Sequence, residues 1–127
     1  MEFCTAINCM DGRVQLPVIR YLQKRFSVPH VDSITEPGPN LILAEQKDLT
    51  LVHSIIERAS ISVEKHKSVG IALAGHYDCA GNPAGKIAQI EHIEKGVTYL
   101  QSEFDNAEVT GLWVGASWEV QEIQDLE

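Results

Sequence analysis

The sequence predicts a single α/β domain over residues 1–127, with a central parallel β-sheet of about four strands flanked by helices. Two observations support this prediction. Short apolar runs of strand length alternate along the chain with longer segments whose apolar residues recur at helical spacing. One of these runs, residues 69–74, is apolar without a break, which is typical of a strand buried on both faces of a parallel sheet.

The first third of the chain contains two expected strands and one expected helix. Residues 3–8 form a mostly apolar run that ends at Cys9. We expect a loop over residues 11–15, and Pro17 then suits the first turn of a helix, where its missing N–H costs little. Residues 31–35 form the second expected strand.

The rest of the chain continues this alternation of helix and strand. A turn-rich loop is expected at residues 36–40, and the tail from Ser117 is acidic and is expected to form a short helix or strand. Between these two segments, the expected elements are a long helix over residues 41–66, a strand over residues 69–74, a helix over residues 84–104 and a fourth strand over residues 109–116.

Two chemistry-bearing clusters follow two of the expected strands. Cys9 ends the first strand, while His76 and Cys79 follow the third. In open α/β sheets, ligands bind beyond the carboxyl ends of the strands, where the strand order reverses. With the strand order 2-1-3-4 this reversal falls between the first and third strands, so Cys9 would lie beside His76 and Cys79.

Composition and charge exclude several classes of protein. A formal net charge of −8 and a pI near 5.0 argue against nucleic-acid binding, which usually needs a basic face. No segment reaches the ~20 apolar residues that span a bilayer, and the N-terminus does not have the pattern of a signal peptide. The odd, low count of three cysteines indicates a reducing compartment, so we expect a cytoplasmic protein without nucleic-acid or membrane partners.

Cys9, His76 and Cys79 are the three ligands of a predicted open zinc site. Zinc prefers thiolate and imidazole ligands, and sites with three protein ligands keep a fourth position for chemistry. Cys4 is a poor fourth ligand, because it lies ~16 Å from Cys9 along a strand at ~3.3 Å per residue. Its odd separation also places it on the opposite face. The alternative interpretation is two inert core thiols and a loop histidine.

Asp11 and Arg13 are the expected partners of this site. A bound zinc ion can bring the pKa of its water to about 7, and Asp11 could accept a hydrogen bond from the resulting hydroxide. Arg13 could hold Asp11 away from the metal through a bidentate ion pair. If Arg13 releases it, Asp11 could bind zinc and close the site. The alternative is a purely structural ion pair.

These motifs, Cys-Met-Asp-Gly-Arg at residues 9–13 and Gly-His-Tyr-Asp-Cys at residues 75–79, resemble the two zinc-binding motifs of β-class carbonic anhydrases. Residues 36–40 stand where that family carries Arg-Asn-Ala-Gly-Asn, and the short chain is similar to a compact, divergent branch. The resemblance implies zinc as cofactor, carbon dioxide and bicarbonate as substrates, Asp11 and Arg13 as the catalytic pair, and a homodimer or higher homo-oligomer. It also leaves two alternatives: a hydrolase of carbonyl sulfide or carbon disulfide, and a non-catalytic zinc-binding or redox-sensing module.

Other notable residues have simpler interpretations. Cys4 is expected to be a small buried hydrophobe and Asp78 a turn residue, with a hydrogen bond to a metal ligand as the alternative for Asp78. His53 and His92 are expected at the surface or the core edge rather than in proton transfer. Trp113 and Trp118 are expected in core and edge packing, with a dimer contact as an alternative.

Overall fold

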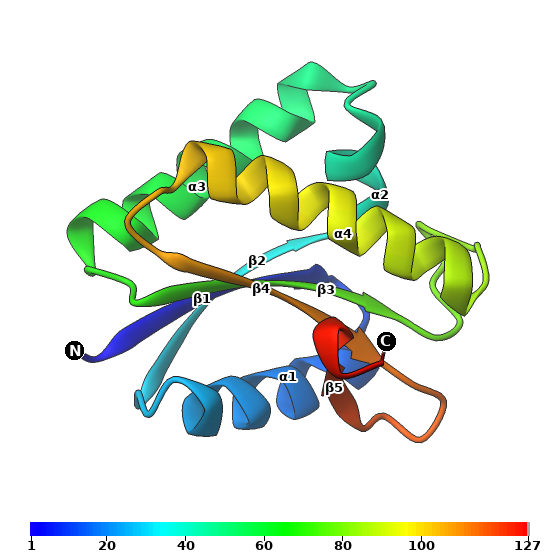
Figure 1. Cartoon of the computed structure of the whole chain (residues 1–127), viewed down its shortest axis with the longest axis horizontal. Coiled ribbons are helices and arrows are strands. Elements are labelled where there is room, and N and C mark those ends of the chain that lie inside the picture. The colour runs from blue at the N-terminus through cyan, green and yellow to red at the C-terminus, as the bar shows by residue number, and fades with distance from the viewer. Residues whose placement is uncertain (127) are drawn as a thin grey trace.

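The computed structural model describes residues 1–126, so Glu127, the last residue of the expected domain, lies outside the described part. Strands and helices alternate along most of the chain (Figure 1). In chain order, the elements are β1 (Phe3–Cys9), α1 (Gly12–Arg25), β2 (His30–Glu36), α2 (Pro39–Glu45), α3 (Leu49–Lys65), β3 (Gly70–His76), α4 (Lys86–Glu103), β4 (Glu108–Val114), β5 (Val120–Glu122) and the 3-10 helix η1 (Ile123–Leu126).

The strands form one sheet in the order β2-β1-β3-β4-β5. β2, β1, β3 and β4 are parallel, and β5 pairs antiparallel with β4. The predicted order 2-1-3-4 is confirmed, and β5 adds a fifth strand. The acidic tail was expected to form one short element, but it forms both a strand and a 3-10 helix.

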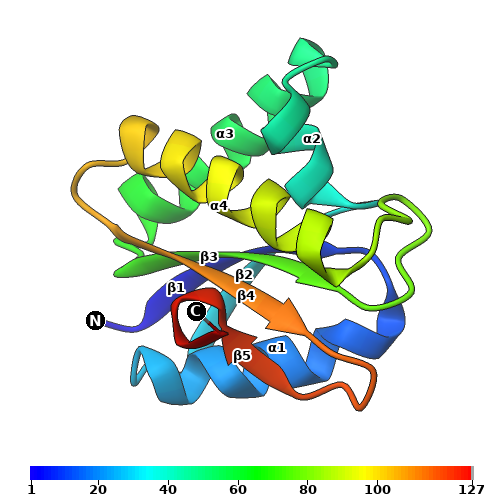
Figure 2. The ribbon, with the colours of Figure 1, turned by 45° about the vertical axis from the view of Figure 1, so that its right-hand side comes forward.

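Helices cover both faces of the sheet. α1 lies on one face, while α2, α3 and α4 lie on the other (Figures 1 and 2). The central strands β1 and β3 are buried along almost their whole length, because helices cover them on both sides. Small residues of these strands pack under α1 and larger ones under the other helices: Ala6, Ala72 and Ala74 on the first face, and Ile7, Ile71 and Leu73 on the second.

Helix α1 begins earlier than predicted. The expected loop over residues 11–15 is wrong, because α1 starts at Gly12 and Pro17 lies inside it. The reason is the side chain of Asp11, whose Oδ1 accepts a hydrogen bond from the Arg13 N–H at 2.9 Å and thereby caps the helix.

The long helix predicted over residues 41–66 is two helices. α2 ends at Gln46, which adopts a left-handed conformation with φ of 57° and donates its N–H to the carbonyl of Ile42 at 3.1 Å. α3 then starts afresh at Leu49, where Asp48 Oδ1 accepts a hydrogen bond from the Leu51 N–H at 3.1 Å. Residues 45–48 are all polar, and these local hydrogen bonds favour a turn there. Within residues 1–126, no helix combines the length and the apolar character of a membrane span.

Candidate metal centre

β1 and β3 stop pairing with each other before either strand ends, at the point where the strand order reverses. The ladder between these strands covers Thr5–Ile71 to Ile7–Leu73, although β1 continues to Cys9 and β3 to His76. Each strand keeps its other neighbour to its end, since β1 pairs with β2 and β3 with β4 up to those last residues. The topology of the sheet therefore places these two unpaired strand ends side by side, where ligands bind in open α/β sheets.

Cys9, His76 and Cys79 meet at these strand ends. One potential ligand atom from each residue lies within 4.8 Å of the other two, and all three residues are buried. The two sulfur atoms are 3.8 Å apart. Two thiolates on one tetrahedral zinc ion, each about 2.3 Å from the metal, would have a similar separation of about 3.8 Å. The structure thus brings together the three residues that the sequence predicts as ligands.

The imidazole of His76 is oriented for metal binding. Its Nδ1 lies 2.6 Å from the carbonyl oxygen of Tyr77. A carbonyl only accepts hydrogen bonds, so Nδ1 carries the proton and Nε2 presents a lone pair. Nε2 is buried and has no hydrogen-bond partner among the described residues. A buried polar atom without a partner is unfavourable, and a metal ion would satisfy it.

The thiol of Cys79 is held by the loop that follows β3. Burial raises the pKa of Cys79, and a hydrogen bond from the Asn82 N–H to Sγ at 3.3 Å opposes part of that rise. Two glycines bring this loop against the loop after β2. A Cβ on Gly81 would lie 2.3 Å from the carbonyl carbon of Pro37, and one on Gly38 would lie 2.7 Å from the carbonyl carbon of Gly81.

Asp11 borders the three ligands and is paired with Arg13. Its Oδ2 lies 4.0 Å from His76 Nε2 and 2.7 Å from Arg13 Nη2, and its Oδ1 accepts from Arg13 Nε at 3.1 Å. Hydrogen bonds from the Arg13 side chain lower the pKa of Asp11 to about 2. Asp11 is therefore a carboxylate at neutral pH, able to accept hydrogen bonds but not to donate them.

Two contacts of Arg13 were not predicted from the sequence. Its Nη1 and Nη2 donate to the carboxylate and the carbonyl of Asp78, at 3.3 and 3.1 Å. The ring of Trp118 covers the guanidinium, whose carbon lies 4.5 Å from the ring centroid. Asp78 is a turn residue, as expected, with φ of 57°, and its carboxylate binds Arg13 rather than a ligand. Its place inside the second motif was a signal that could have suggested such a role.

Cys4 belongs to the same buried cluster under α1 as Cys9. Strand alternation indicates that the two side chains leave β1 on opposite faces, and this stays a prediction. Cys4 is nevertheless not in the metal-ligand group among the described residues, and it is fully buried, as expected for a small hydrophobe.

The remaining candidates lie outside the cluster of ligands. His53 is exposed on α3. On α4, the Nδ1 atom of His92 lies 3.0 Å from the side-chain amide nitrogen of Asn82. Trp113 packs with Ile93 in the core beside α4.

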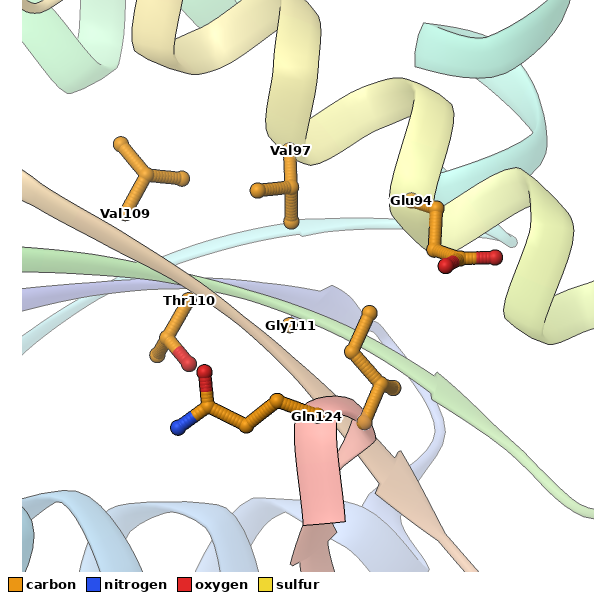
Figure 3. A pocket seen from close by; sticks show the side chains of 7 residues that line it. Glu94, Val97, Val109, Thr110, Gly111 and Gln124 are labelled. Carbon is orange, nitrogen blue, oxygen red and sulfur yellow. The ribbon is translucent and has the colours of Figure 1, made fainter. Parts of the chain in front are cut away.

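A separate pocket of about 190 Å³ lies between α4, β4 and η1 (Figure 3). It shares no residue with the metal-ligand group. Its lining consists of Glu94, Val97, Val109, Thr110, Gly111, Ile123 and Gln124.

Comparisons with known proteins agree with this arrangement. A family model described as "Putative carbonic anhydrase" matches residues 1–124. The β-carbonic anhydrase CafA of Aspergillus fumigatus has a similar structure, with a TM-score of 0.60 and 14% identity over 95% of this chain and 74% of that one. A second similar chain comes from the crystal structures of two tetrameric β-carbonic anhydrases of Sordaria macrospora. Its TM-score is 0.61, with 16% identity over 96% of this chain and 80% of that one. No curated protein matches the sequence.

Proposed function

This chain belongs to the family of carbonic anhydrase-like proteins whose model it matches over residues 1–124, and from this premise we propose that it is a zinc enzyme that hydrates carbon dioxide to bicarbonate and a proton. The fold is that of β-carbonic anhydrases. One observation carries the proposal beyond the fold: the buried, unpartnered Nε2 of His76 lies beside the two thiols of Cys9 and Cys79.

In this proposal Cys9, His76 and Cys79 hold the zinc ion. When bound, the ion supplies a Lewis acid that brings the pKa of a coordinated water to about 7. The donor set of two sulfur atoms and one nitrogen suits zinc and leaves a fourth position open. Tyr77 fixes the tautomer of the histidine through its carbonyl, and Asn82 orients the sulfur of Cys79.

Asp11 and Arg13 are proposed to orient the attacking water. The ionised carboxylate of Asp11 can accept a hydrogen bond from that water and so direct a lone pair toward carbon dioxide. Arg13 occupies both oxygens of Asp11, which keeps this carboxylate from becoming a metal ligand itself.

We also propose that the protein is a homo-oligomer in the cytoplasm. One of the similar structures is described as tetrameric. Large apolar side chains are exposed beside the metal centre, where Met10 follows Cys9 and Tyr77 follows His76, with exposed fractions of 64% and 51%. A second copy of the chain would cover them. The three free cysteines support a reducing compartment.

Stopped-flow measurement of carbon dioxide hydration tests the function. We expect zinc-loaded protein to exceed the buffer rate from about pH 6 to about pH 9, a range that includes the pKa of about 7 of a zinc-coordinated water. Asp11→Ala should remove most of this excess rate, while Asp105→Ala, which changes an exposed carboxylate in the turn after α4, should leave it unchanged. The absence of an excess rate at every pH would overturn the assignment of carbon dioxide as substrate. Release of hydrogen sulfide from carbonyl sulfide would then identify carbonyl sulfide as the substrate instead.

A second candidate function uses the same thiols without turnover. The sulfur atoms of Cys9 and Cys79 are 3.8 Å apart, so hydrogen peroxide could oxidise the metal-free pair to a disulfide, with release of two waters. Titration of free thiols after treatment with peroxide measures this. A protein that loses two thiols reversibly and shows no hydration would be a redox module.

A further inference from the structure

The guanidinium of Arg13 is contacted by residues of three different loops. In its plane it donates to Asp11, from the loop after β1, and to Asp78, from the loop after β3. Its face is covered by Trp118, from the loop between β4 and β5. The hydrogen bonds use the edge of the group, and the indole ring covers a face that cannot form hydrogen bonds.

The loop that carries Trp118 is held in an unusual conformation. Trp118 has φ of 62°, in the left-handed region that bulky residues rarely adopt. Its N–H binds the carbonyl of Gly115 at 2.9 Å, and the N–H of Gly115 binds the carbonyl of Glu119 at 3.1 Å. The pairing of Val114 with Val120 then fixes both ends of the loop. The hairpin thus maintains a strained backbone that places an indole ring over the edge of the metal centre.

Trp118 also lies close to the candidate ligand His76. Their ring centroids are 6.3 Å apart, and the indole is partly buried against the cluster under α1. Asp11 lies between Arg13 and the candidate ligands, since its Oδ2 is 2.7 Å from Arg13 Nη2 and 4.0 Å from His76 Nε2. A group that immobilises Arg13 therefore helps to decide whether Asp11 stays on Arg13 or turns toward the ligands.

We propose that Trp118 is a positioning residue that holds the guanidinium of Arg13 on Asp11 and so keeps this carboxylate out of the metal's coordination sphere. The inference rests on the proposed function for the presence of the metal. It goes beyond that function because it makes the fourth coordination position depend on the loop between β4 and β5. This loop carries none of the three candidate ligands. Removal of the ring frees Arg13 and lets Asp11 turn toward the ligands.

The variant Trp118→Asn tests this proposal with the least disturbance of the loop. Asparagine tolerates positive φ, so the variant removes the ring while it suits the backbone. Trp118→Phe keeps an aromatic face over Arg13 and should behave like the unmodified protein. Phe26→Leu is the matched control, because the ring of Phe26 covers another guanidinium, that of Arg25, at 4.8 Å and away from the metal centre.

The first measurement needs no metal. In the NMR spectrum of the metal-free protein, the Nε–H resonance of Arg13 should carry a ring-current shift from Trp118. We expect Trp118→Asn to remove this shift and Phe26→Leu to retain it. An Nε–H resonance that is unchanged in Trp118→Asn would overturn the proposal, whether or not the protein proves to be a zinc enzyme.

The second measurement follows the binding of azide to the cobalt-substituted protein by visible absorption. Azide needs an open coordination position, so we expect its affinity to fall about two- to fivefold in Trp118→Asn, as estimated from the energy of a cation–π contact. Adding Asp11→Asn should restore the affinity, because an amide is a poorer metal ligand than a carboxylate. Equal affinity in Trp118→Asn and the unmodified protein would overturn the proposal. Failure of the unmodified protein to bind cobalt would contradict the proposed function, and the Arg13 resonance alone would then decide the role of Trp118.

Discussion

The side-chain amide of Gln89 donates a hydrogen bond to the main-chain carbonyl of His76 at 2.8 Å. The same Nε2 lies 3.1 Å from the carbonyls of Asn82 and Ala84, and Oε1 accepts from Asn40 at 3.2 Å. Gln89 is almost fully buried, so helix α4 holds the end of β3 and the following loop through one side chain. This clamp places the main chain that carries two of the three candidate ligands.

Gln89→Glu is expected to weaken both the fold and the metal centre. A carboxylate cannot donate to the carbonyls, and burying it beside them is unfavourable, so the free energy of unfolding should fall by at least about 2 kcal/mol. Zinc affinity should fall by about tenfold or more, as for the loss of other groups that orient metal ligands. Urea denaturation and competition with a chromophoric chelator measure the two effects.

Gln101→Glu is the matched control for this prediction. Near the other end of α4, the amide of Gln101 donates to the carbonyls of Phe104 and Ala107, each at 2.9 Å. The control should lose stability and keep its zinc affinity. Equal zinc affinity in both variants would show that the Gln89 clamp does not support the metal centre.

Removal of single thiols should separate ligands from packing residues. Cys9→Ala removes one proposed ligand, so the purified protein should lose stoichiometric zinc after dialysis. Cys4→Ala removes an equally buried thiol from the same cluster and should keep one zinc ion per chain. Metal analysis of the dialysed proteins checks this. Loss of zinc in Cys4→Ala but not in Cys9→Ala would contradict the assignment of ligands.

Gly81→Ala should be strongly unfavourable where Gly85→Ala is tolerated. The new Cβ at residue 81 would meet the main chain of Pro37 at 2.3 Å, so the two loops must separate. We expect a loss of about 1–3 kcal/mol, as for other overpacked sites, and weaker zinc binding because Asn82 moves away from Cys79. A Cβ at Gly85 meets nothing within 4 Å. Urea denaturation of both variants tests this, and similar losses would argue against close packing of the loops.

The stability of the protein should fall between pH 9 and pH 11, in part because of Cys4. Burial, with a smaller contribution from Asp32, raises the pKa of the Cys4 thiol from its usual 9.0 to about 11. Below pH 9 the thiol is protonated in both states and has no effect. Between these values the unfolded chain loses the proton while the folded chain keeps it, so a rise in pH favours unfolding. Urea denaturation should show a smaller decline in Cys4→Ala, and an unchanged slope would argue against the raised pKa.

The parallel sheet and the grouping of Cys9, His76 and Cys79 at one edge could be predicted from the alternation of apolar runs and helical segments along the chain. Cys9 and His76 each end an apolar run, and parallel strands bring such ends to one edge of a sheet. The long helix is two helices because the chain turns at residues 45–48, which are all polar and lie between two apolar helical segments. The side chains of Gln46 and Asp48 hydrogen-bond to nearby main-chain atoms, and this favours a turn over a continuous helix.

The contacts that support the site could not be predicted, because they are made by residues far apart in the sequence. In the sequence, Gln89 is one polar residue among others in a helix, and it is buried only because α4 packs beside Gly75. Trp118 follows the last strand of the parallel sheet, and no sequence pattern connects it with Arg13. Their contacts arise from the path of the hairpin and the helix in space.

A metal ion bound at the ends of β1 and β3 would have a consequence for the lifetime of the folded chain. Cys9 and Cys79 are separated by 70 positions along the sequence. An ion held by both would close a loop that includes α1, β2, α2, α3 and β3, and a cross-link over a loop of this size restricts the unfolded chain by an entropy worth about 4 kcal/mol. Metal supply would then set how often the chain opens to proteases, so that a cell short of zinc would remove the metal-free protein by degradation.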